Sequence, residues 1–203
     1  MQRAIFFDKD GTLIENLPYN VDPSLIRFMP GAAAALVALY TAGYRLFIIS
    51  NQSGVARGYF AEAALAGVQQ WLASQFSAIG VVLDGFSYCP HHPAGRVAAY
   101  TTICNCRKPA PGMLLQAARD HQIDLGQSWM IGDILDDVEA GHRAACKTML
   151  VNNGGETEWV FGPLRKPHIM VRDLAAAADV ILATDAYRPI RRAPAALFQE
   201  VLM

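Results

Sequence analysis

Short apolar runs rich in β-branched and aromatic residues alternate along the chain with longer runs rich in alanine and leucine. The short runs predict buried strands, and the longer ones predict helices. One helix also has a proline near its start and a glycine just past its end, as helix boundaries commonly do. The predicted strands are residues 3–7, 44–50, 128–132 and 147–151, with a further strand contained within 81–88 and a sixth short strand at 179–182. The predicted helices are residues 31–42, 62–78, 111–122 and 135–144.

Strands that are apolar throughout and alternate with helices are typical of a parallel sheet with helices on both faces. The pattern therefore predicts an α/β fold of three layers, a doubly wound, Rossmann-like sheet. We expect one domain over residues 1–183. Residues 184–203 are expected to form a C-terminal extension packed on that domain, with a short amphipathic helix from residue 194.

The composition excludes several classes of protein. Hydrophobic residues make up 53% of the 203 residues and charged residues 17%, so a disordered or fibrous chain is excluded. The net charge of −1 offers no basic surface for nucleic acid or anionic membranes. Because no apolar run approaches the ~18 residues of a membrane span, and the N-terminus has no signal-like segment, we expect a cytoplasmic protein.

Polar side chains follow directly after several predicted strands. Asp8 and Asp10 follow the first strand, residues 50–54 (SNQSG) end the second, and Asp133, Asp136 and Asp137 follow the strand at 128–132. In a doubly wound sheet these groups meet at the carboxyl edge, where ligands bind. Clustered carboxylates need a cation, and hard oxygen ligands suit Mg²⁺. Lys108 and Ser50 beside such a metal suit a phosphoryl group.

Each of these features also has an ordinary structural interpretation. A single Asp-x-Asp after a strand is more often a turn or a helix cap, and Ser-Asn at a strand end is usually a cap. The interpretation as a catalytic site depends on the ordered set, which is Asp-x-Asp-Gly-Thr, then Ser-Asn, then Lys, then Gly-Asp-x-x-x-Asp.

The long segment 89–110 contains three of the four cysteines. Two short motifs, Cys89-x-His91 and Cys104-x-Cys106, offer three thiolates and one imidazole, which suit a closed tetrahedral Zn²⁺ site. The alternative is three free thiols and two surface histidines; His91 is favoured over His92 as the fourth ligand. A bound zinc would order a loop that has no strands of its own, residues 89–106. Cys146 is isolated and is expected in the core.

The ordered set resembles the haloacid dehalogenase (HAD) superfamily of phosphohydrolases, with DKDGT at 8–12, SNQSG at 50–54, CRKP at 106–109 and GDILDD at 132–137. The resemblance implies an aspartyl-phosphate mechanism. Asp8 would be the nucleophile and Asp10 the general acid–base, while Ser50 would bind the phosphoryl oxygens. The implied remaining roles are charge neutralisation by Lys108, Mg²⁺ binding by Asp8, Asp133 and the Asp10 carbonyl, and support by Gly11, Thr12 and Asp137.

Within the superfamily, the zinc loop together with SNQSG and RKPAPGM (107–113) resembles the phosphatases of subfamily IIIA that remove the 7-phosphate of a heptose 1,7-bisphosphate in lipopolysaccharide precursor synthesis. Histidinol-phosphate phosphatases share the Cys-x-His and Cys-x-Cys pairs with a shorter gap, and stay an alternative. Ile134 stands where these phosphatases often carry lysine, which leaves the substrate open. The implied substrate-binding residues are Ser50, Asn51, Gln52, Arg57, Arg107 and Lys108.

Only 39 residues separate Asp10 from Ser50, and the zinc loop fills the next interval, so no cap domain fits. We expect an open site on a monomer, with a small phosphorylated sugar as partner. Local loops, including residues 16–19, would set the selectivity. A different class of function, a zinc-stabilised binding module without activity, is disfavoured because all the catalytic side chains are present.

Overall fold

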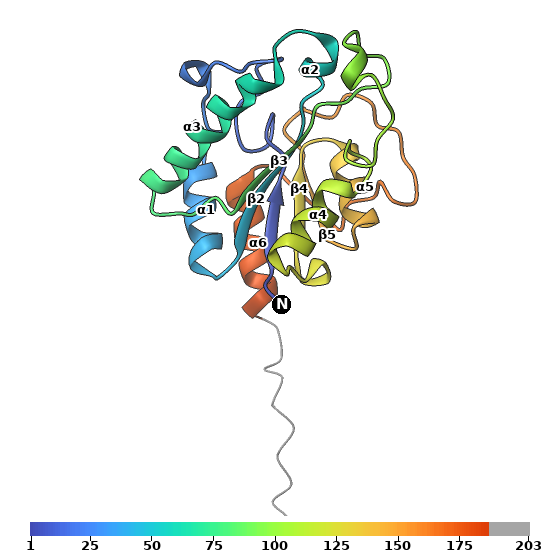
Figure 1. The fold of residues 1–203 in the computed structure, drawn as a ribbon. Helices are drawn as coiled ribbons and strands as arrows, with labels where there is room; N and C mark the ends of the chain where they lie inside the picture. The colour runs from blue at the N-terminus through green and yellow to red at the C-terminus, as the bar shows by residue number, and fades with distance from the viewer. Residues whose placement is uncertain (187–203) are drawn as a thin grey trace, which may run out of the picture.

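A computed structural model of the chain describes residues 1–186, which form a single six-stranded parallel sheet flanked by helices (Figure 1). The strand order is β3-β2-β1-β4-β5-β6, so β1 lies in the middle and the direction of winding reverses between β1 and β4. The strands are β1 (Ala4–Phe7), β2 (Arg45–Asn51), β3 (Gly85–Cys89), β4 (Trp129–Gly132), β5 (Lys147–Val151) and β6 (Ile169–Val171).

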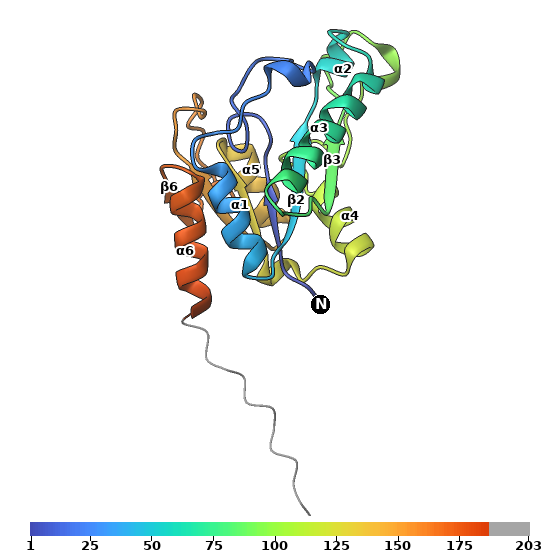
Figure 2. The same ribbon diagram turned by 90° about the vertical axis from the view of Figure 1, so that its left-hand side faces the viewer.

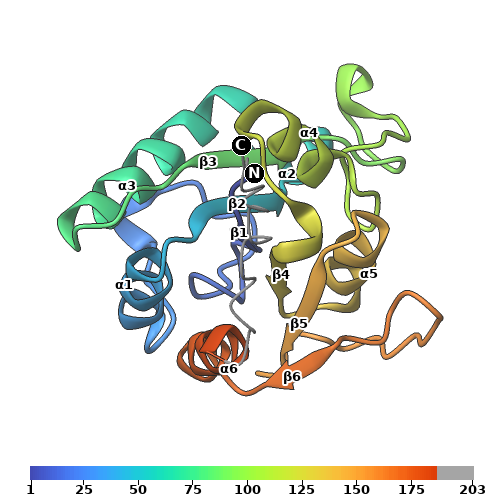
Figure 3. The same ribbon diagram turned by 90° about the horizontal axis from the view of Figure 1, so that it is seen from below.

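Helices cover both faces of the sheet, as Figure 3 shows in the view from below. One face packs against α1 (Ala32–Thr41), α3 (Leu65–Ala78) and α6 (Leu174–Ala186), and α1 and α6 lie side by side in Figure 2. The other face packs against α4 (Gly112–His121) and α5 (Leu135–Arg143). Alternate strand residues enter the two cores: Phe7 packs with the first set of helices and Phe6 with the second.

The predicted three-layer fold is confirmed, and its carboxyl edge gathers the loops that follow the strands (Figure 1). A short helix, α2 (Gly54–Arg57), follows β2 at this edge, and the long loop after β3 lies beside it. Short 3₁₀ helices occupy Pro23–Leu25, Glu62–Ala64, Ala98–Tyr100 and Leu125–Gln127.

The strand predicted at 179–182 is wrong, because these residues lie inside α6. The segment Asp179–Leu182 contains β-branched residues, but the alanines before it favour a helix. Leu174, Ala177, Ala178 and Ile181 are buried at helical spacing and cover the sheet. The sixth strand is instead Ile169–Val171, three residues at the sheet edge, which is too short for its pattern to predict.

Smaller differences affect the third strand and the C-terminal segment. The third strand, expected within residues 81–88, is Gly85–Cys89 and so ends one residue later. Helix α6 continues through residue 183, where the domain was expected to end. The helix predicted from residue 194 lies outside the described residues.

Candidate active site

Two buried aspartates follow the two central strands. Asp8 comes after β1 and Asp133 after β4, at the point where the strand order reverses. The backbone N–H of Asp8 donates to the carbonyl of Ile131 at 2.8 Å, which extends the pairing of β1 with β4 to the sheet edge. The fold therefore places both carboxylates at the switch point of the sheet, where ligands bind in folds of this class.

Lys108 links this pair to a third carboxylate. Its ammonium is almost fully buried and contacts Asp8, the carbonyl of Ile49 at 2.9 Å and Asp137 Oδ1 at 2.6 Å. Burial lowers the pKa of Lys108, but the Asp137 and Asp8 carboxylates outweigh this and raise it above its ordinary value. Lys108 is therefore a permanent cation between two carboxylates.

One lysine does not neutralise the carboxylates gathered here. One oxygen from each of Asp8, Asp133 and Asp137 lies within 4.8 Å of the others. The pKa of Asp133 is raised to about 7, chiefly by burial and then by the Asp8 carboxylate. Burial likewise raises the pKa of Asp137, and the Lys108 ammonium opposes that rise. An excess of buried negative charge on oxygen ligands fits a hard divalent cation.

Asp10 is held separately from this cluster. One carboxylate oxygen contacts Lys9 Nζ at 2.6 Å, and the other accepts a hydrogen bond from Gln52 Nε2 at 3.1 Å. Burial raises the pKa of Asp10 and the Asp8 carboxylate adds to the rise, while the Lys9 ammonium opposes it. A carboxyl group with a raised pKa beside a pocket can donate a proton near neutral pH.

The end of β2 supplies Ser50 and Asn51, and Gln52 follows directly after it. Ser50 Oγ is buried and accepts a hydrogen bond from Gln52 Nε2 at 2.8 Å. The amide of Asn51 donates to the carbonyl of Lys108 at 3.1 Å and accepts from its N–H at 3.0 Å. Asn51, predicted as a substrate ligand, thus uses its polar atoms to join β2 to the Lys108 segment, although it also lines the pocket.

Asp133 is enclosed by two glycines from distant parts of the chain. Thr12 Oγ1 donates to Asp133 Oδ1 at 3.1 Å. A Cβ atom on Gly11 would lie 2.2 Å from Asp133 Oδ2, and one on Gly155 would lie 2.0 Å from the same oxygen. Gly11 also has a φ of +85°, which favours glycine. The position of the Asp133 carboxylate therefore requires that the backbone on both sides of it, at Gly11 and Gly155, carries no side chain.

The loop after β5, residues 152–168, contributes residues that the sequence analysis missed. Asn153 Nδ2 donates to the Gly11 carbonyl at 2.6 Å, and Glu156 accepts from the N–H of Leu135 at the start of α5 at 2.7 Å. The signal was present: Asn-Asn-Gly-Gly follows a strand, as Asp8 and Asp133 do.

A pocket of about 170 Å³ opens above these groups. A groove of about 280 Å³ adjoins it, and both are lined by Asp10, Asn16 and Asn51. Neutral groups such as Tyr19, Asn20 and Ser53 line the rest of the groove. The pocket itself is lined by Asp8, Asp10, Asn16, Ser50, Asn51, Lys108, Asp133, Ile134 and Gly155.

The two arginines predicted as substrate ligands lie in different surroundings. Arg107 lines a hollow of about 330 Å³ together with Lys108 and Arg143, and its buried Nη1 makes no hydrogen bond to protein. Arg57 lines neither this hollow nor the catalytic pocket, and its Nη2 contacts His92 Nε2 at 3.2 Å. The structure thus brings Arg107, but not Arg57, beside Lys108.

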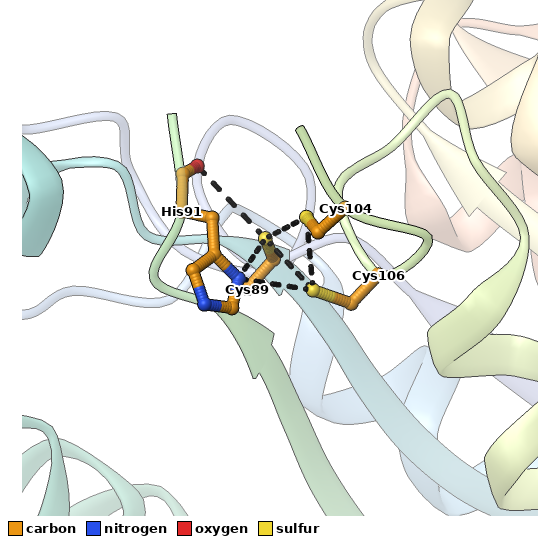
Figure 4. Close-up of side chains that lie close together, drawn as sticks. All are labelled: Cys89, His91, Cys104 and Cys106. Atoms are coloured by element: carbon orange, nitrogen blue, oxygen red, sulfur yellow. Dashed lines mark hydrogen bonds between the residues drawn. The ribbon is translucent and has the colours of Figure 1, made fainter. Parts of the chain in front are cut away.

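The Cys-rich loop brings four side chains to one point, as Figure 4 shows. The three sulfur atoms lie 3.1 to 3.5 Å apart, and His91 Nδ1 lies 3.4 Å from Cys106 Sγ. These spacings exceed a disulfide bond of ~2 Å and are slightly shorter than the ~3.7 Å between thiolates on a tetrahedral zinc. His92 faces Arg57 instead. The cluster of Cys89, His91, Cys104 and Cys106 can hold a metal ion.

The same loop also packs against α2. Ala56 donates its N–H to the Pro90 carbonyl at 3.2 Å, and its own carbonyl accepts from Arg96 at 2.6 Å and Val97 at 2.9 Å. Cys106 is followed directly by Arg107 and Lys108. The Cys/His cluster therefore supports two walls of the site, although none of its four residues lines the pocket.

Among residues 1–186, no helix is long and apolar enough to cross a membrane.

Comparison with known proteins identifies the class first. A model of the HAD-hydrolase-like family matches residues 105–177. The chain is 44% identical over 155 residues to the D-glycero-beta-D-manno-heptose-1,7-bisphosphate 7-phosphatase of Pasteurella multocida, which covers 76% of this chain and 84% of the relative. The phosphatase of the same name from Yersinia pestis is 39% identical over 170 residues, covering 79% of this chain and 90% of the relative.

Solved structures agree with this result. A crystal structure described as HAD-like phosphatase from Mesorhizobium loti matches with a TM-score of 0.78 and 32% identity, covering 94% of this chain and 90% of that one. D,D-heptose 1,7-bisphosphate phosphatase from B. bronchiseptica, complexed with magnesium and phosphate, matches with a TM-score of 0.74 and 30% identity. The match covers 90% of this chain and 99% of that one. The chain therefore belongs to the HAD-like phosphatase family that includes the D-glycero-beta-D-manno-heptose-1,7-bisphosphate 7-phosphatases, and it is a hydrolase of phosphoric monoesters.

Proposed function

We propose that the protein is a Mg²⁺-dependent phosphatase that removes the 7-phosphate of D-glycero-D-manno-heptose 1,7-bisphosphate through an aspartyl-phosphate on Asp8. The observation that carries the proposal is the buried cluster of Asp8, Asp133 and Lys108 below a pocket at the switch point of the sheet. The relatives named above, and the magnesium and phosphate in one related structure, support it.

Mg²⁺ would be held by the Asp8 and Asp133 carboxylates and the Asp10 carbonyl, and would supply Lewis-acid stabilisation of the phosphoryl oxygens. Asp137 contacts Lys108 at 2.6 Å, so we assign it to holding the lysine. Lys108 holds the Asp8 carboxylate through their ion pair and offsets charge that develops on the phosphoryl group, while Ser50 donates a hydrogen bond to that group.

Hydrolysis would proceed in two displacements. A carboxylate oxygen of Asp8 forms a bond to phosphorus as the ester P–O bond breaks, and the Asp10 carboxyl gives its proton to the leaving alkoxide. The Asp10 carboxylate then takes a proton from the water that attacks the aspartyl-phosphate, which releases inorganic phosphate and restores both residues.

The second phosphate of the substrate would lie in the hollow beside Lys108. Arg107 and Arg143 line it, and Arg107 has a buried donor with no protein partner. A guanidinium group with free donors suits a phosphate. Arg57 contacts His92, so its effect on substrate would be indirect.

Phosphate release from a panel of esters tests the substrate. With Mg²⁺, we expect kcat/KM for the heptose 1,7-bisphosphate, in at least one anomer, to exceed that for histidinol phosphate by about 100-fold or more, equivalent to about 2.7 kcal/mol of differential transition-state binding. Phosphorus NMR would identify which phosphate leaves. A higher kcat/KM for histidinol phosphate, or loss of the 1-phosphate, would contradict the proposal.

We propose Zn²⁺ for the Cys/His cluster, as a structural ion in a cytoplasmic, monomeric enzyme where thiols stay reduced. Burial raises the pKa of Cys89, and the neighbouring Cys106 thiol adds to the rise, so a bound cation would favour the Cys89 thiolate. The loop would then lose its anchor on α2.

Replacing one proposed zinc ligand should lower both stability and activity. We expect Cys104→Ser to lose bound zinc, to unfold several degrees lower and to lose roughly 10-fold in kcat/KM, because Arg107 and Lys108 follow the last ligand. Metal analysis, thermal unfolding and kinetics check this. Cys146→Ala is the control. Cys146 lies outside the cluster, so this variant protein should keep its bound zinc. Full zinc content in Cys104→Ser would refute the assignment.

Gly155→Ala should weaken Mg²⁺ binding. The added Cβ would lie 2.0 Å from Asp133 Oδ2, while the backbone of Gly155 is not at positive φ and permits alanine. We expect the Mg²⁺ concentration for half-maximal activity to rise about 10-fold, roughly 1.4 kcal/mol of lost affinity. Gly67→Ala, with nothing within 4 Å of its Cβ, should leave it unchanged. An unchanged Mg²⁺ requirement in Gly155→Ala would show that the Asp133 carboxylate can move without loss of Mg²⁺ affinity.

A further inference from the structure

Gln52 lines the groove beside the catalytic pocket, and its side-chain amide also makes hydrogen bonds within the protein. It follows β2, is 6% exposed, and its backbone N–H donates to the Cys89 carbonyl at 2.8 Å. Its side-chain nitrogen lies 3.1 Å from Asp10 Oδ2 and 2.8 Å from Ser50 Oγ. An amide nitrogen carries two hydrogens, so both can be used within the protein.

Hydrogen-bond chemistry fixes the direction of both contacts. Gln52 Nε2 donates to Asp10 Oδ2, and the carboxyl oxygens have further lone pairs that can carry the proton that Asp10 transfers. The same nitrogen then donates to Ser50 Oγ, because it has no lone pair with which to accept. A hydroxyl that accepts from Gln52 keeps its own hydrogen to donate to a phosphoryl oxygen.

The carboxylate of Asp10 is held at both oxygens. Lys9 Nζ contacts Oδ1 at 2.6 Å and Gln52 contacts Oδ2 at 3.1 Å. Lys9 is next to Asp10 in sequence and moves with the same turn, whereas Gln52 follows directly after β2, which also carries Ser50. Gln52 is therefore the contact that fixes Asp10 relative to Ser50. Proton transfer depends on such placement, since small displacements of a catalytic group cost large factors in rate.

We propose that Gln52 is a positioning residue for protonation of the leaving group, acting through Asp10, and that it also directs the Ser50 hydroxyl toward the phosphoryl group. This inference rests on the proposed phosphatase mechanism. In the step concerned, the ester P–O bond breaks as the bond from Asp8 to phosphorus forms, and the proton of the Asp10 carboxyl passes to the departing oxygen. Gln52 exchanges no proton in this step.

The dependence of the rate on the leaving group tests this role. A sugar alkoxide needs a proton to leave, whereas p-nitrophenolate does not. Gln52→Met has similar length and no donor. We expect it to lower kcat/KM for a sugar phosphate by about 100-fold and kcat/KM for p-nitrophenyl phosphate by only about 3-fold, with the smaller loss reflecting Ser50. The comparison uses kcat/KM because this constant reports formation of the aspartyl-phosphate and excludes its hydrolysis, in which Asp10 acts as a base for both substrates. Gln52→Glu, which replaces the donor with an oxygen, should show the same contrast and serves if Gln52→Met does not fold.

Gln70→Met is the matched control, because Gln70 is exposed on α3 and should leave both rates unchanged. Equal losses of kcat/KM on the two substrates, or no loss, in a folded Gln52 variant would overturn the inference while leaving the phosphatase function intact. Failure of the unaltered protein to hydrolyse either substrate with Mg²⁺ would overturn the proposed function and the inference with it.

Discussion

Asp8→Asn should lower kcat by about 10⁴-fold or more on every phosphate ester, because the carboxylate that attacks phosphorus is removed. The substitution preserves the shape of the side chain. Lys108 keeps its contact with Asp137 at 2.6 Å, so the lysine is not left without a counter-charge. We therefore expect the fold to survive and the loss to fall on chemistry. Steady-state kinetics and thermal unfolding of the same preparation separate the two.

A matched control is Asp120→Asn, which makes the same chemical change at an exposed position on α4. Its kcat should stay within about 2-fold of the unaltered protein, since surface substitutions of this kind change little. Mass spectrometry after rapid acid quenching should find a phosphoryl group on the unaltered protein and none on Asp8→Asn. Substantial turnover by Asp8→Asn would mean that water attacks the substrate directly.

The three-layer architecture could be predicted from the sequence. Each apolar strand is recognisable from a few neighbouring residues, and apolar strands that alternate with helices are typical of a parallel sheet. Asp8 and Asp133 were predicted to follow strands at the same edge of the sheet, and the structure adds that these strands, β1 and β4, are the two adjacent central ones. The elements at the C-terminal end of the domain were harder to predict. Residues 179–182 look like a strand in isolation, but the alanines before them favour a helix, and packing of Ala177 and Ile181 against the sheet stabilises it. Tertiary burial overrides local preference in such short segments.

Side-chain partners within the site were less predictable than its location. Polar residues at the end of β2 could face either substrate or protein, and periodicity does not distinguish the two. The structure pairs Asn51 with the Lys108 backbone and Gln52 with Asp10 and Ser50. Gly155 acts through its missing side chain beside Asp133, at a distance of 22 residues in sequence, so only the fold reveals it.

Asp133→Asn should abolish Mg²⁺-dependent turnover and yet stabilise the metal-free protein. The pKa of Asp133 is raised to about 7, first by burial and then by Asp8, so the fold favours the protonated carboxyl. The stability from this group is fully present below the unfolded pKa near ~4 and is lost as pH rises through about 7. At pH 8 the ionised carboxylate costs up to about 4 kcal/mol. Asparagine keeps an acceptor for Thr12 and carries no charge.

The expected gain is at least about 1 kcal/mol at pH 8, or about 2–4 °C in Tm for a chain of this length. Unfolding is measured in chelator at pH 8 and pH 5.5, then with Mg²⁺. The unaltered protein should gain stability from Mg²⁺ and from the lower pH, and Asp133→Asn should gain less from either. Its kcat should fall about 10³-fold or more, because the metal loses a ligand. A lower Tm for Asp133→Asn in chelator at pH 8 would mean that Asp133 contributes more through its contacts than its charge costs. If the gain is observed, the ionised Asp133 carboxylate destabilises the metal-free fold and is retained for its function. Binding of the cation would then remove this cost.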